Sequence, residues 1–276
     1  MLDGKKLKEK LKAGQVVTSI MLRFPDPSLA EMLAIQGVEL EIMALAGVDL
    51  IVIDNEHYVL VAQRTPRSTR VPYAARLRSV VRLPNVEEAR IAQVMDMGSD
   101  GIQIPSVGSY EEAMELVQAV KFAPEGKRGF FPITRAANYG NVMTPEEFAR
   151  LSNENSFVVP QIETKEGVED IDRILAIPQT DWVPIGPSDL TASYGCPGKY
   201  DDPRVVNAIK TVREKALAVR KIGWEMYHTP ETMAQAKKDG TYFLSLGSDQ
   251  QILMNGLKQL VGAVRDWQAQ QEQKAD

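Results

Sequence analysis

Eight short apolar runs, most of them followed by a stretch of helical periodicity, constrain the fold of this chain more than any other feature. Most of the runs are continuously apolar rather than alternating, which is typical of parallel strands covered on both faces. The runs are Val16–Met21, Leu50–Asp54, Ser79–Leu83, Gly101–Pro105, Val158–Glu163, Val183–Gly186, Ile222–Tyr227 and Tyr242–Gly247. Eight strand–helix repeats predict one α/β domain over residues 1–276, a (β/α)8 TIM barrel. The main alternative, a doubly wound open sheet, normally has a glycine-rich phosphate-binding turn after its first strand, and the sequence has none there.

The stretches between the runs carry helix start signals. Residues that can cap a helix, each followed either by Glu three positions later or directly by Pro, occur at Ser28, Asn85, Ser109, Thr144 and Thr229. A short helix is expected before the first strand, and the amphipathic pattern of Leu253–Val264 predicts a final one. We expect the polar tail, Gln268–Asp276, to fray.

Two stretches depart from the pattern. Glu31–Gly37 (EMLAIQG) is echoed by Glu41–Gly47 (EIMALAG), which we interpret as an extension of the first barrel helix. Val59–Ala75 contains two prolines and several arginines, which interrupt any long amphipathic helix. An irregular connection is therefore predicted there.

The charge balance excludes two classes of partner. The chain has 32 Lys and Arg against 37 Asp and Glu, a net charge of −5, with no basic run. This argues against nucleic acid and an anionic membrane surface as partners. No apolar run reaches the roughly 18 residues of a membrane span. Residues Met1–Lys12 lack the apolar core of a signal peptide, so a cytoplasmic location is expected.

The chain has one cysteine, Cys196, and two histidines, His57 and His228. One cysteine cannot form an intrachain disulfide, and this set cannot build a Cys-rich or three-His zinc site. A metal would need oxygen ligands, which favours hard divalent ions such as Mg²⁺ or Mn²⁺. We interpret Cys196 as a turn residue and His228 as a loop contact.

Two carboxylates at the carboxyl ends of predicted strands are the strongest candidates for chemistry, since barrel active sites gather there. Glu163 and Asp189 lie 26 positions apart, about one strand–helix repeat, so they would occupy the rim of adjacent strands. Two carboxylates with water and substrate oxygens can hold Mg²⁺. The alternative is that both are solvated residues that cap helices.

Three other residues at strand ends complete the candidate site. His57, in the segment IDNEH, could be a general base near neutral pH or an ordinary surface histidine. Arg82 faces an anion or a developing oxyanion in the barrel mouth, or it pairs with a rim carboxylate. Gln161 alternates with Glu163, so both could point inward, or Gln161 could make a hydrogen bond across the barrel.

Taken together, these segments resemble the HpcH/HpaI family of class II pyruvate aldolases. The likeness extends from about Met21 to Val264. The segments that carry it, in order, are IDNEH, VVRLPN, EEARIAQVMDMGSDGIQIP, PEGKRG, PQIET, IGPSDLTASYG and SLGSD. The ordered set is highly specific, although each segment by itself is weak.

The resemblance implies a (β/α)8 barrel whose last helix is often exchanged between the subunits of a dimer, and hexamers built as trimers of dimers. It implies a divalent metal (Mg²⁺, Mn²⁺ or Co²⁺) and reversible aldol cleavage of a 4-hydroxy-2-oxo acid to pyruvate, or a related 2-oxo acid, and an aldehyde. The family's metal ligands match Glu163 and Asp189, its base His57 and its oxyanion-stabilising arginine Arg82. Its substrate contacts match Arg82, Gln161, Ser188 and Asp189.

The family also has an aspartate that raises the proton affinity of the base, and this residue matches Asp96. Asp96 lies near the end of a predicted helix that leads into the amino end of the fourth strand, far from the mouth of its own barrel. We therefore expect Asp96 to act on a neighbouring subunit's site. Asp54, three residues before His57, is the local alternative.

The sequence departs from the family around the strand that carries His57. Residues 31–47 resemble an insertion, and residues 58–75 replace a glycine-containing turn and a regular helix. Two other functions therefore stay open. One is oxaloacetate decarboxylation to the same enolate, as in macrophomate-synthase-like relatives, and the other is a metal-binding barrel with impaired catalysis.

Overall fold

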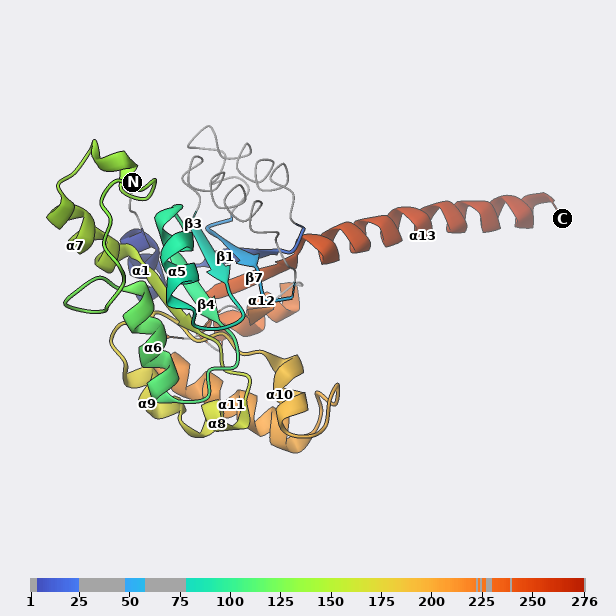
Figure 1. Ribbon diagram of the computed structural model, residues 1–276. Helices are drawn as coiled ribbons and strands as arrows, with labels where there is room; N and C mark the ends of the chain where they lie inside the picture. The colour runs from blue at the N-terminus through green and yellow to red at the C-terminus, as the bar shows by residue number, and fades with distance from the viewer. Residues whose placement is uncertain are drawn as a thin grey trace.

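A parallel sheet of seven strands forms the centre of the molecule (Figure 1). The computed structural model describes residues 4–24, 48–57, 78–221, 223, 225–226, 230–238 and 240–275. The strand order is β5–β4–β3–β2–β1–β7–β6. The strands are β1 (Val17–Leu22), β2 (Leu50–Asp54), β3 (Arg78–Arg82), β4 (Gly101–Ile104), β5 (Phe157–Pro160), β6 (Glu225–Met226) and β7 (Phe243–Ser248). Each overlaps one of the predicted runs, so the strand prediction is confirmed for these seven.

The remaining predicted strand, Val183–Gly186, makes backbone hydrogen bonds on both of its sides without forming a full strand. On one side, the N–H of Ile162 donates to the carbonyl of Pro184 at 2.9 Å. On the other, the N–H of Val183 donates to the carbonyl of Lys221 at 2.8 Å. Backbone pairing therefore continues from β5 toward the segment that leads into β6. The fold is α/β, with a parallel sheet of the TIM-barrel type.

In the described parts of the chain, a helix precedes β1 and helices follow most of the other strands. They are α1 (Gly4–Lys12), α5 (Glu88–Asp96), α6 (Tyr110–Val120), α7 (Pro145–Asn155), α8 (Lys165–Glu169), α9 (Ile171–Ala176), α10 (Pro187–Ser193), α11 (Pro203–Ala218), α12 (Pro230–Lys238) and α13 (Asp249–Ala275), with a short 3-10 helix at Asn138–Gly140. The strands β2 and β3, together with Leu83 directly after β3, comprise 11 residues, of which ten are buried. Because both faces of these strands are covered, their sequences are continuously apolar.

Alternate side chains along the strands pack into two different apolar clusters. The outer cluster joins Ile51, Ile53 and Val81 to residues of α5 and α6. The inner cluster contains Leu50, Val52, Val80, Phe157, Val159, Trp182 and Phe243, with Leu7 of α1. Because side chains alternate with a period of two, Asp54, Arg82 and Gln161 lie on the same face as the inner cluster, at the carboxyl ends of their strands.

Two of the predicted helix starts are confirmed. Ser109 caps α6 by accepting from the N–H of Glu112, and Thr144 caps α7 in a full capping box with Glu147. The prediction for Asn85 is wrong, because α5 begins after Glu87 and has no side-chain cap. The signals at Ser28 and Thr229 lie outside the described residues.

The tail that was predicted to fray is helical as far as Ala275. Its sequence, QAQQEQKA, is rich in residues of high intrinsic helix propensity, which continue the preceding amphipathic helix. In Figure 1, α13 projects away from the rest of the molecule. Among the described helices, none has the length and apolar character that a membrane crossing requires.

Candidate active site

A cavity of about 360 Å³ opens at the carboxyl ends of the strands. One part of its wall contains six residues predicted for the site: His57, Arg82, Gln161, Glu163, Ser188 and Asp189. Another part, formed by β1, β7 and α13, contributes Ser19, Arg23, Ser245, Ser248 and Gln251. The structure therefore brings these predicted residues together, with Asp54 behind the cavity wall against Arg82, whereas Asp96 lies elsewhere.

Arg82 is held by two carboxylates beside this cavity. The register of β2 and β3 places Asp54 opposite Arg82. The Arg82 guanidinium donates from Nε to Asp54 Oδ1 at 3.1 Å and from Nη2 to Oδ2 at 2.6 Å, and its Nη1 lies 2.9 Å from Glu56 Oε2. Arg82 Nη2 also contacts the sulfur of Met21 at 3.9 Å. A guanidinium has five N–H groups, so this arrangement orients Arg82 and leaves one N–H group of Nη1 for a further anion.

The charge of Asp54 is stabilised by the same contacts. Burial alone would raise the pKa of this carboxyl, but the hydrogen bonds and positive charge of Arg82 outweigh burial and hold the pKa below its usual value. Burial raises the pKa of Glu56, against the opposing charge of Arg82. The predicted alternative in which Arg82 pairs with a rim carboxylate is thus present in the structure.

Among the acidic residues that line the cavity, Glu163 has the most strongly shifted pKa. Its side chain is buried, and Ser106 donates to its Oε1 from the backbone N–H at 2.9 Å and from the hydroxyl at 3.1 Å. Ser106 has φ 54°, a left-handed conformation that is costly for a residue with a Cβ. Burial and then the negative charges of Asp189 and Glu56 raise the pKa of Glu163 to about 7.

Gly186 allows the backbone to approach Glu163 closely. A Cβ at this position would lie 1.9 Å from Glu163 Oε2 and 2.7 Å from Gln161 Nε2. The chain then enters α10, whose first turn carries Ser188 and Asp189 on the cavity wall. The Ser188 hydroxyl lies 3.1 Å from the Tyr200 hydroxyl, within hydrogen-bonding distance.

His57 lies at the edge of the cavity, directly after β2. Its side chain is 54% exposed, and its Nε2 is 3.7 Å from Glu56 Oε1. The structure pairs Asp54 with Arg82 rather than with His57, so the local alternative for orienting the base does not match the contacts that are present.

The donor set fits a hard divalent cation. Glu163 is a buried carboxylate that faces two further carboxylates, and such a group is stabilised in its ionised form by a nearby cation. Among the described residues no cluster of three or more acidic, His or Cys side chains is arranged to hold a metal. The protein would therefore supply Glu163 and Asp189, and water and substrate oxygens would supply the other ligands.

The family model for HpcH/HpaI aldolase/citrate lyase matches residues 35–256, which is most of the chain. The chain belongs to this family. The resemblance inferred from the ordered segments is confirmed.

Individual members of the HpcH/HpaI family show the extent of the similarity. A 5-keto-4-deoxy-D-glucarate aldolase from Enterobacter sp. (strain 638) is 31% identical over 83% of this chain and 88% of its own. A 2-keto-3-deoxy-L-rhamnonate aldolase from Escherichia coli is 29% identical over 91% of this chain and 90% of its own. The crystal structure of an HpcH/HpaI aldolase from Desulfitobacterium hafniense has a TM-score of 0.80 and 28% identity, and covers 94% of this chain and 96% of that one.

Asp96 lies away from the cavity in this HpcH/HpaI chain. It ends α5, and β4 starts only five residues later, so Asp96 is at the amino edge of the sheet. Its Oδ1 lies 2.5 Å from Nη2 of Arg128, and 28% of its side chain is exposed. This is the position expected from the sequence, and a role at a neighbouring subunit's site stays a prediction.

Sequence reasoning missed several residues of the site. Gln103 is buried on β4 and donates from Nε2 to Gln161 Oε1. The signal for it was available, because a glutamine within the apolar run GIQIP must find a partner. The part of the cavity wall formed by Ser245, Ser248 and Gln251 was harder to predict from the sequence. Its position depends on where α13 begins.

Several predicted features cannot be located in the structure. Residues 31–47, residues 58–75 and His228 lie outside the described residues.

Cys196 is buried and has no disulfide.

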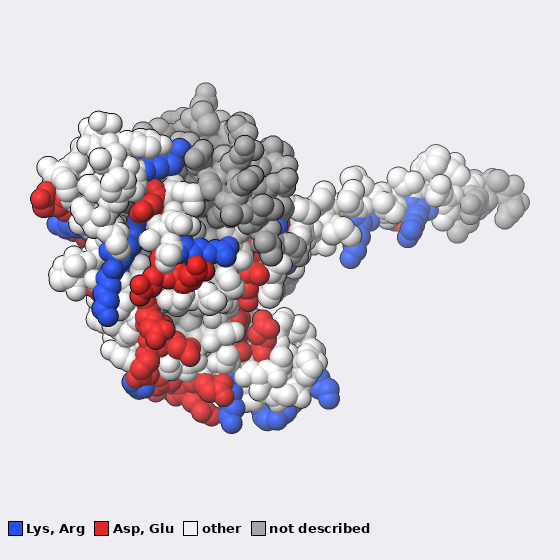
Figure 2. Space-filling model, in the orientation of Figure 1, with Lys and Arg blue, Asp and Glu red and all other residues white. Residues whose placement is uncertain are grey.

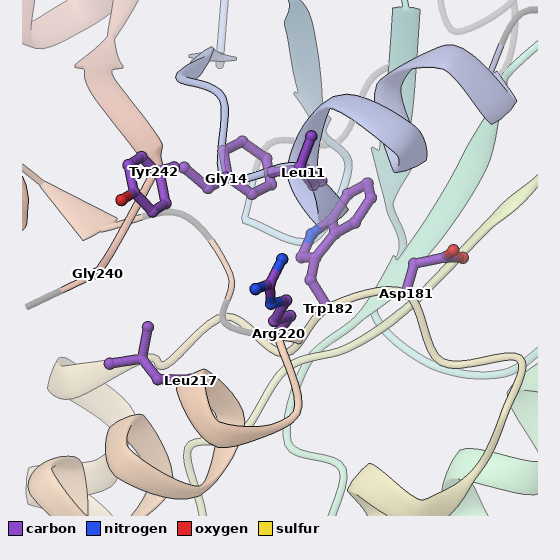
Figure 3. Close-up of a pocket in the computed structure, with 10 residues that line it drawn as sticks. Leu11, Gly14, Asp181, Trp182, Leu217, Arg220, Gly240 and Tyr242 are labelled. Atoms are coloured by element: carbon purple, nitrogen blue, oxygen red, sulfur yellow. The ribbon is translucent and has the colours of Figure 1, made fainter.

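A second cavity, of about 310 Å³, lies at the amino edge of the sheet, away from the predicted site. Figure 3 shows the Arg220 side chain pointing into it beside the Trp182 ring. Arg220 donates to the carbonyl of Lys12 at the end of α1, and Asp181 lies 2.9 Å from the ammonium of Lys8. The charged groups of this cavity are thus engaged in contacts that hold the fold together.

The outer surface contrasts with the active-site cavity. Figure 2 shows acidic side chains gathered on the face that it displays, with Lys and Arg scattered among them. Arg173 on α9, for example, pairs with Glu111 on α6 at 2.6 Å. The cavity wall is more balanced, with two arginines, Arg82 and Arg23, and two carboxylates, Glu163 and Asp189. An anionic substrate that meets the arginines is therefore compatible with the acidic net charge of the chain.

Proposed function

We propose that this protein catalyses metal-dependent, reversible aldol cleavage of a 4-hydroxy-2-oxo acid to pyruvate, or a related 2-oxo acid, and an aldehyde. The observation that carries the proposal is the buried Glu163 carboxylate, with its pKa raised to about 7, in one cavity with Asp189, Gln161 and the oriented Arg82. The relatives named above are aldolases of sugar-derived oxo acids, which supports this reaction class.

Glu163 and Asp189 would hold the divalent ion, for which we propose Mg²⁺, with Mn²⁺ or Co²⁺ as alternatives. When bound, the ion supplies Lewis acidity that makes the protons next to the keto group easier to remove. The chain's own groups do the rest. Gln161 and Ser188 bind and orient the oxo acid, and the remaining N–H group of Arg82 stabilises charge that develops on the keto oxygen.

His57 would move the proton. At the cavity edge, its imidazole can take a proton from the C4 hydroxyl of the substrate, directly or through water, as the C–C bond breaks. In the reverse direction it returns that proton to the aldehyde oxygen. Because no amine participates, borohydride with pyruvate should trap no lysine adduct.

Pyruvate release from several 4-hydroxy-2-oxo acids, with Mg²⁺, Mn²⁺ or Co²⁺ and after EDTA treatment, tests the proposal. We expect EDTA to abolish turnover, added metal to restore it, and Glu163→Gln to remove it. Deuterium exchange at the methyl group of pyruvate is a separate test of enolisation. Borohydride trapping together with EDTA-resistant turnover would overturn the mechanism, and loss of exchange with metal present would support a barrel with impaired catalysis.

A second candidate is oxaloacetate decarboxylation to the same enolate. It is favoured by the contrast between the buried Arg82 network and His57, whose side chain is 54% exposed. Decarboxylation needs the metal and Arg82 but not the base. If His57→Ala abolishes aldol cleavage and spares decarboxylation, the protein has both activities.

We also propose that the protein is a homo-oligomer in which α13 packs on a partner subunit. The residues Leu257, Leu260, Val261, Val264 and Trp267 of α13 are between 47% and 68% exposed, although all are large and apolar. A contiguous exposed apolar face of this kind is typical of a surface that binds a partner. A hexamer built as a trimer of dimers is our specific proposal. The single cysteine is compatible with the proposed cytoplasmic location.

A further inference from the structure

Three buried polar side chains form a chain of hydrogen bonds inside the sheet. Gln103 on β4, Gln161 after β5 and Glu163 are 0%, 3% and 1% exposed. Gln103 Nε2 donates to Gln161 Oε1, and Gln161 Nε2 donates to Glu163 Oε2. The β4–β5 register places Gln103 beside Val159, two residues before Gln161, so Gln103 and Gln161 share one face.

The direction of these bonds follows from the chemistry of Glu163. As a metal ligand Glu163 is ionised, and an ionised carboxylate only accepts hydrogen bonds, so Gln161 must turn its NH₂ group toward it. The carbonyl oxygen of Gln161 then points the opposite way, into the buried interior, where it needs a donor. Gln103 supplies that donor.

The other sides of Glu163 are already fixed. Ser106 donates twice to Oε1, and Gly186 approaches so closely that a Cβ there would lie 1.9 Å from Oε2. Among the described hydrogen-bond partners of Glu163, Gln161 is thus the one whose orientation can reverse by rotation of its amide. The group that prevents this rotation is Gln103.

We infer that Gln103 is a positioning residue: it holds Gln161 as a donor to Glu163 and so orients Glu163 as a metal ligand. The inference rests on the proposed metal site and adds to it a residue that does not touch the ion. Groups that orient metal ligands typically change metal affinity by about 10- to 100-fold when they are removed.

Gln103→Met tests the role, with Mn²⁺ affinity measured by titration of the protein without substrate. Methionine has a similar volume, and Gln103 Oε1 has no hydrogen-bond partner among the described groups, so the change also removes an unsatisfied buried acceptor. We expect Mn²⁺ to bind about 10-fold more weakly. The midpoint of urea unfolding should change little, because the donor that Gln161 Oε1 loses is offset by removal of the unsatisfied Gln103 Oε1. Gln103→Leu provides a second variant that keeps the site apolar.

A double-mutant cycle with Gln161→Met separates positioning from a general structural effect. If Gln103 acts through Gln161, Gln103→Met should weaken Mn²⁺ binding in the wild-type background and have no further effect in the Gln161→Met background. Ser79→Ala is the matched control, because Ser79 is a buried polar residue of β3 whose Oγ has no partner among the described groups. It should leave Mn²⁺ affinity within about twofold of the wild type.

The outcomes are distinguishable. If the wild type binds Mn²⁺ and Gln103→Met binds it equally well, or if the loss is the same in both backgrounds, the positioning role is overturned while the proposed function stands. If the wild type binds no Mn²⁺ and exchanges no pyruvate protons, the proposed function fails and this inference fails with it.

Discussion

At the scale of single residues, Gly186 is the position where one added methyl group would disturb the site most. Its φ of −100° is accessible to any residue, so an alanine there would be excluded by space alone. A Cβ would lie 1.9 Å from Glu163 Oε2 and 2.7 Å from Gln161 Nε2, which forces the carboxylate to move. We predict that Gly186→Ala lowers Mn²⁺ affinity by at least about 10-fold, measured by titration.

The control for this prediction is Gly129→Ala. Gly129 is exposed, and no atom lies within 4 Å of the position that its Cβ would take. Gly129→Ala should therefore bind Mn²⁺ like the wild type. Normal affinity in Gly186→Ala would show that Glu163 has more freedom to move than its contacts indicate.

A second residue-scale prediction concerns Lys121, which is buried at the end of α6. Its Nζ donates to the carbonyls of Asn153 at 2.6 Å and Ser156 at 2.9 Å. Burial, with a smaller contribution from the positive charge of Lys8, lowers its pKa from 10.5 to about 8. Between these values the unfolded chain binds more protons than the folded chain, so the contribution of Lys121 to the free energy of unfolding becomes more favourable as pH rises.

Urea unfolding of the wild type and Lys121→Met at about pH 7.5 and about pH 9.5 tests this, and the difference between them should move in favour of the wild type by about 2 kcal/mol. The comparison with Lys121→Met cancels the titration of other groups. A difference that stays constant with pH would mean that Lys121 keeps its proton in the folded chain over this range.

Which residues enter the site was largely predictable, but their partners were not. The period of two along a strand places Gln161 and Glu163 on one face, and strand ends identify Arg82 and His57 as rim residues. The pairing of Arg82 with Asp54 depends on the register between β2 and β3, which the sequence of neither strand specifies. For this reason Asp54 was considered as a partner of His57, whereas it contacts Arg82.

At the scale of secondary-structure elements, caps with local chemistry were predictable and helix ends were not. Thr144 and Ser109 cap their helices because each signal acts within four residues. The residue at which α13 ends depends on the helix propensity of its last turns and on the surface that covers the helix. The sequence therefore predicted a helix over Leu253–Val264, whereas the structure has one over Asp249–Ala275.

The exposed apolar face of α13 leads to an element-scale prediction. Leu260→Glu places a charge on the face that we propose to lie against a partner subunit, and burying an unpaired charge is costly. We expect the mass measured by light scattering after size-exclusion chromatography to fall. Gln259→Glu is the matched control, since it adds the same carboxylate one residue away, on a different side of the helix.

An unchanged mass in Leu260→Glu would contradict the proposed packing of α13. A reduced mass in both variants would attribute the effect to added charge rather than to the apolar face. A reduced mass in Leu260→Glu alone would support the role of this face in assembly.

At the scale of the whole molecule, the alternation of runs and helices predicted the architecture because it is a global pattern that no single loop can change. The sheet order and the TIM-barrel type of fold follow from it. The pattern contains no information on how copies of the chain contact one another. The proposed role of Asp96 depends on such a contact, since Asp96 and the cavity lie at opposite edges of the sheet.

The last prediction tests whether one active site uses residues of two subunits. Asp96→Ala and His57→Ala should each lose most aldol cleavage as separate homo-oligomers. If Asp96 acts on the His57 of a neighbouring subunit, randomly mixed oligomers of the two variants contain intact sites, and about a quarter of the wild-type activity should return. Asp172→Ala, which removes an exposed carboxylate of α9, should keep full activity.

Mixed oligomers no more active than the separate variants would show that Asp96 does not complement His57 across an interface. Full activity of Asp96→Ala alone, in a well-folded oligomer, would exclude any role in the reaction and leave its ion pair with Arg128 as its function. Recovery of activity would explain why an acid so far from its own cavity matches the family's position. The smallest active unit would then be two chains.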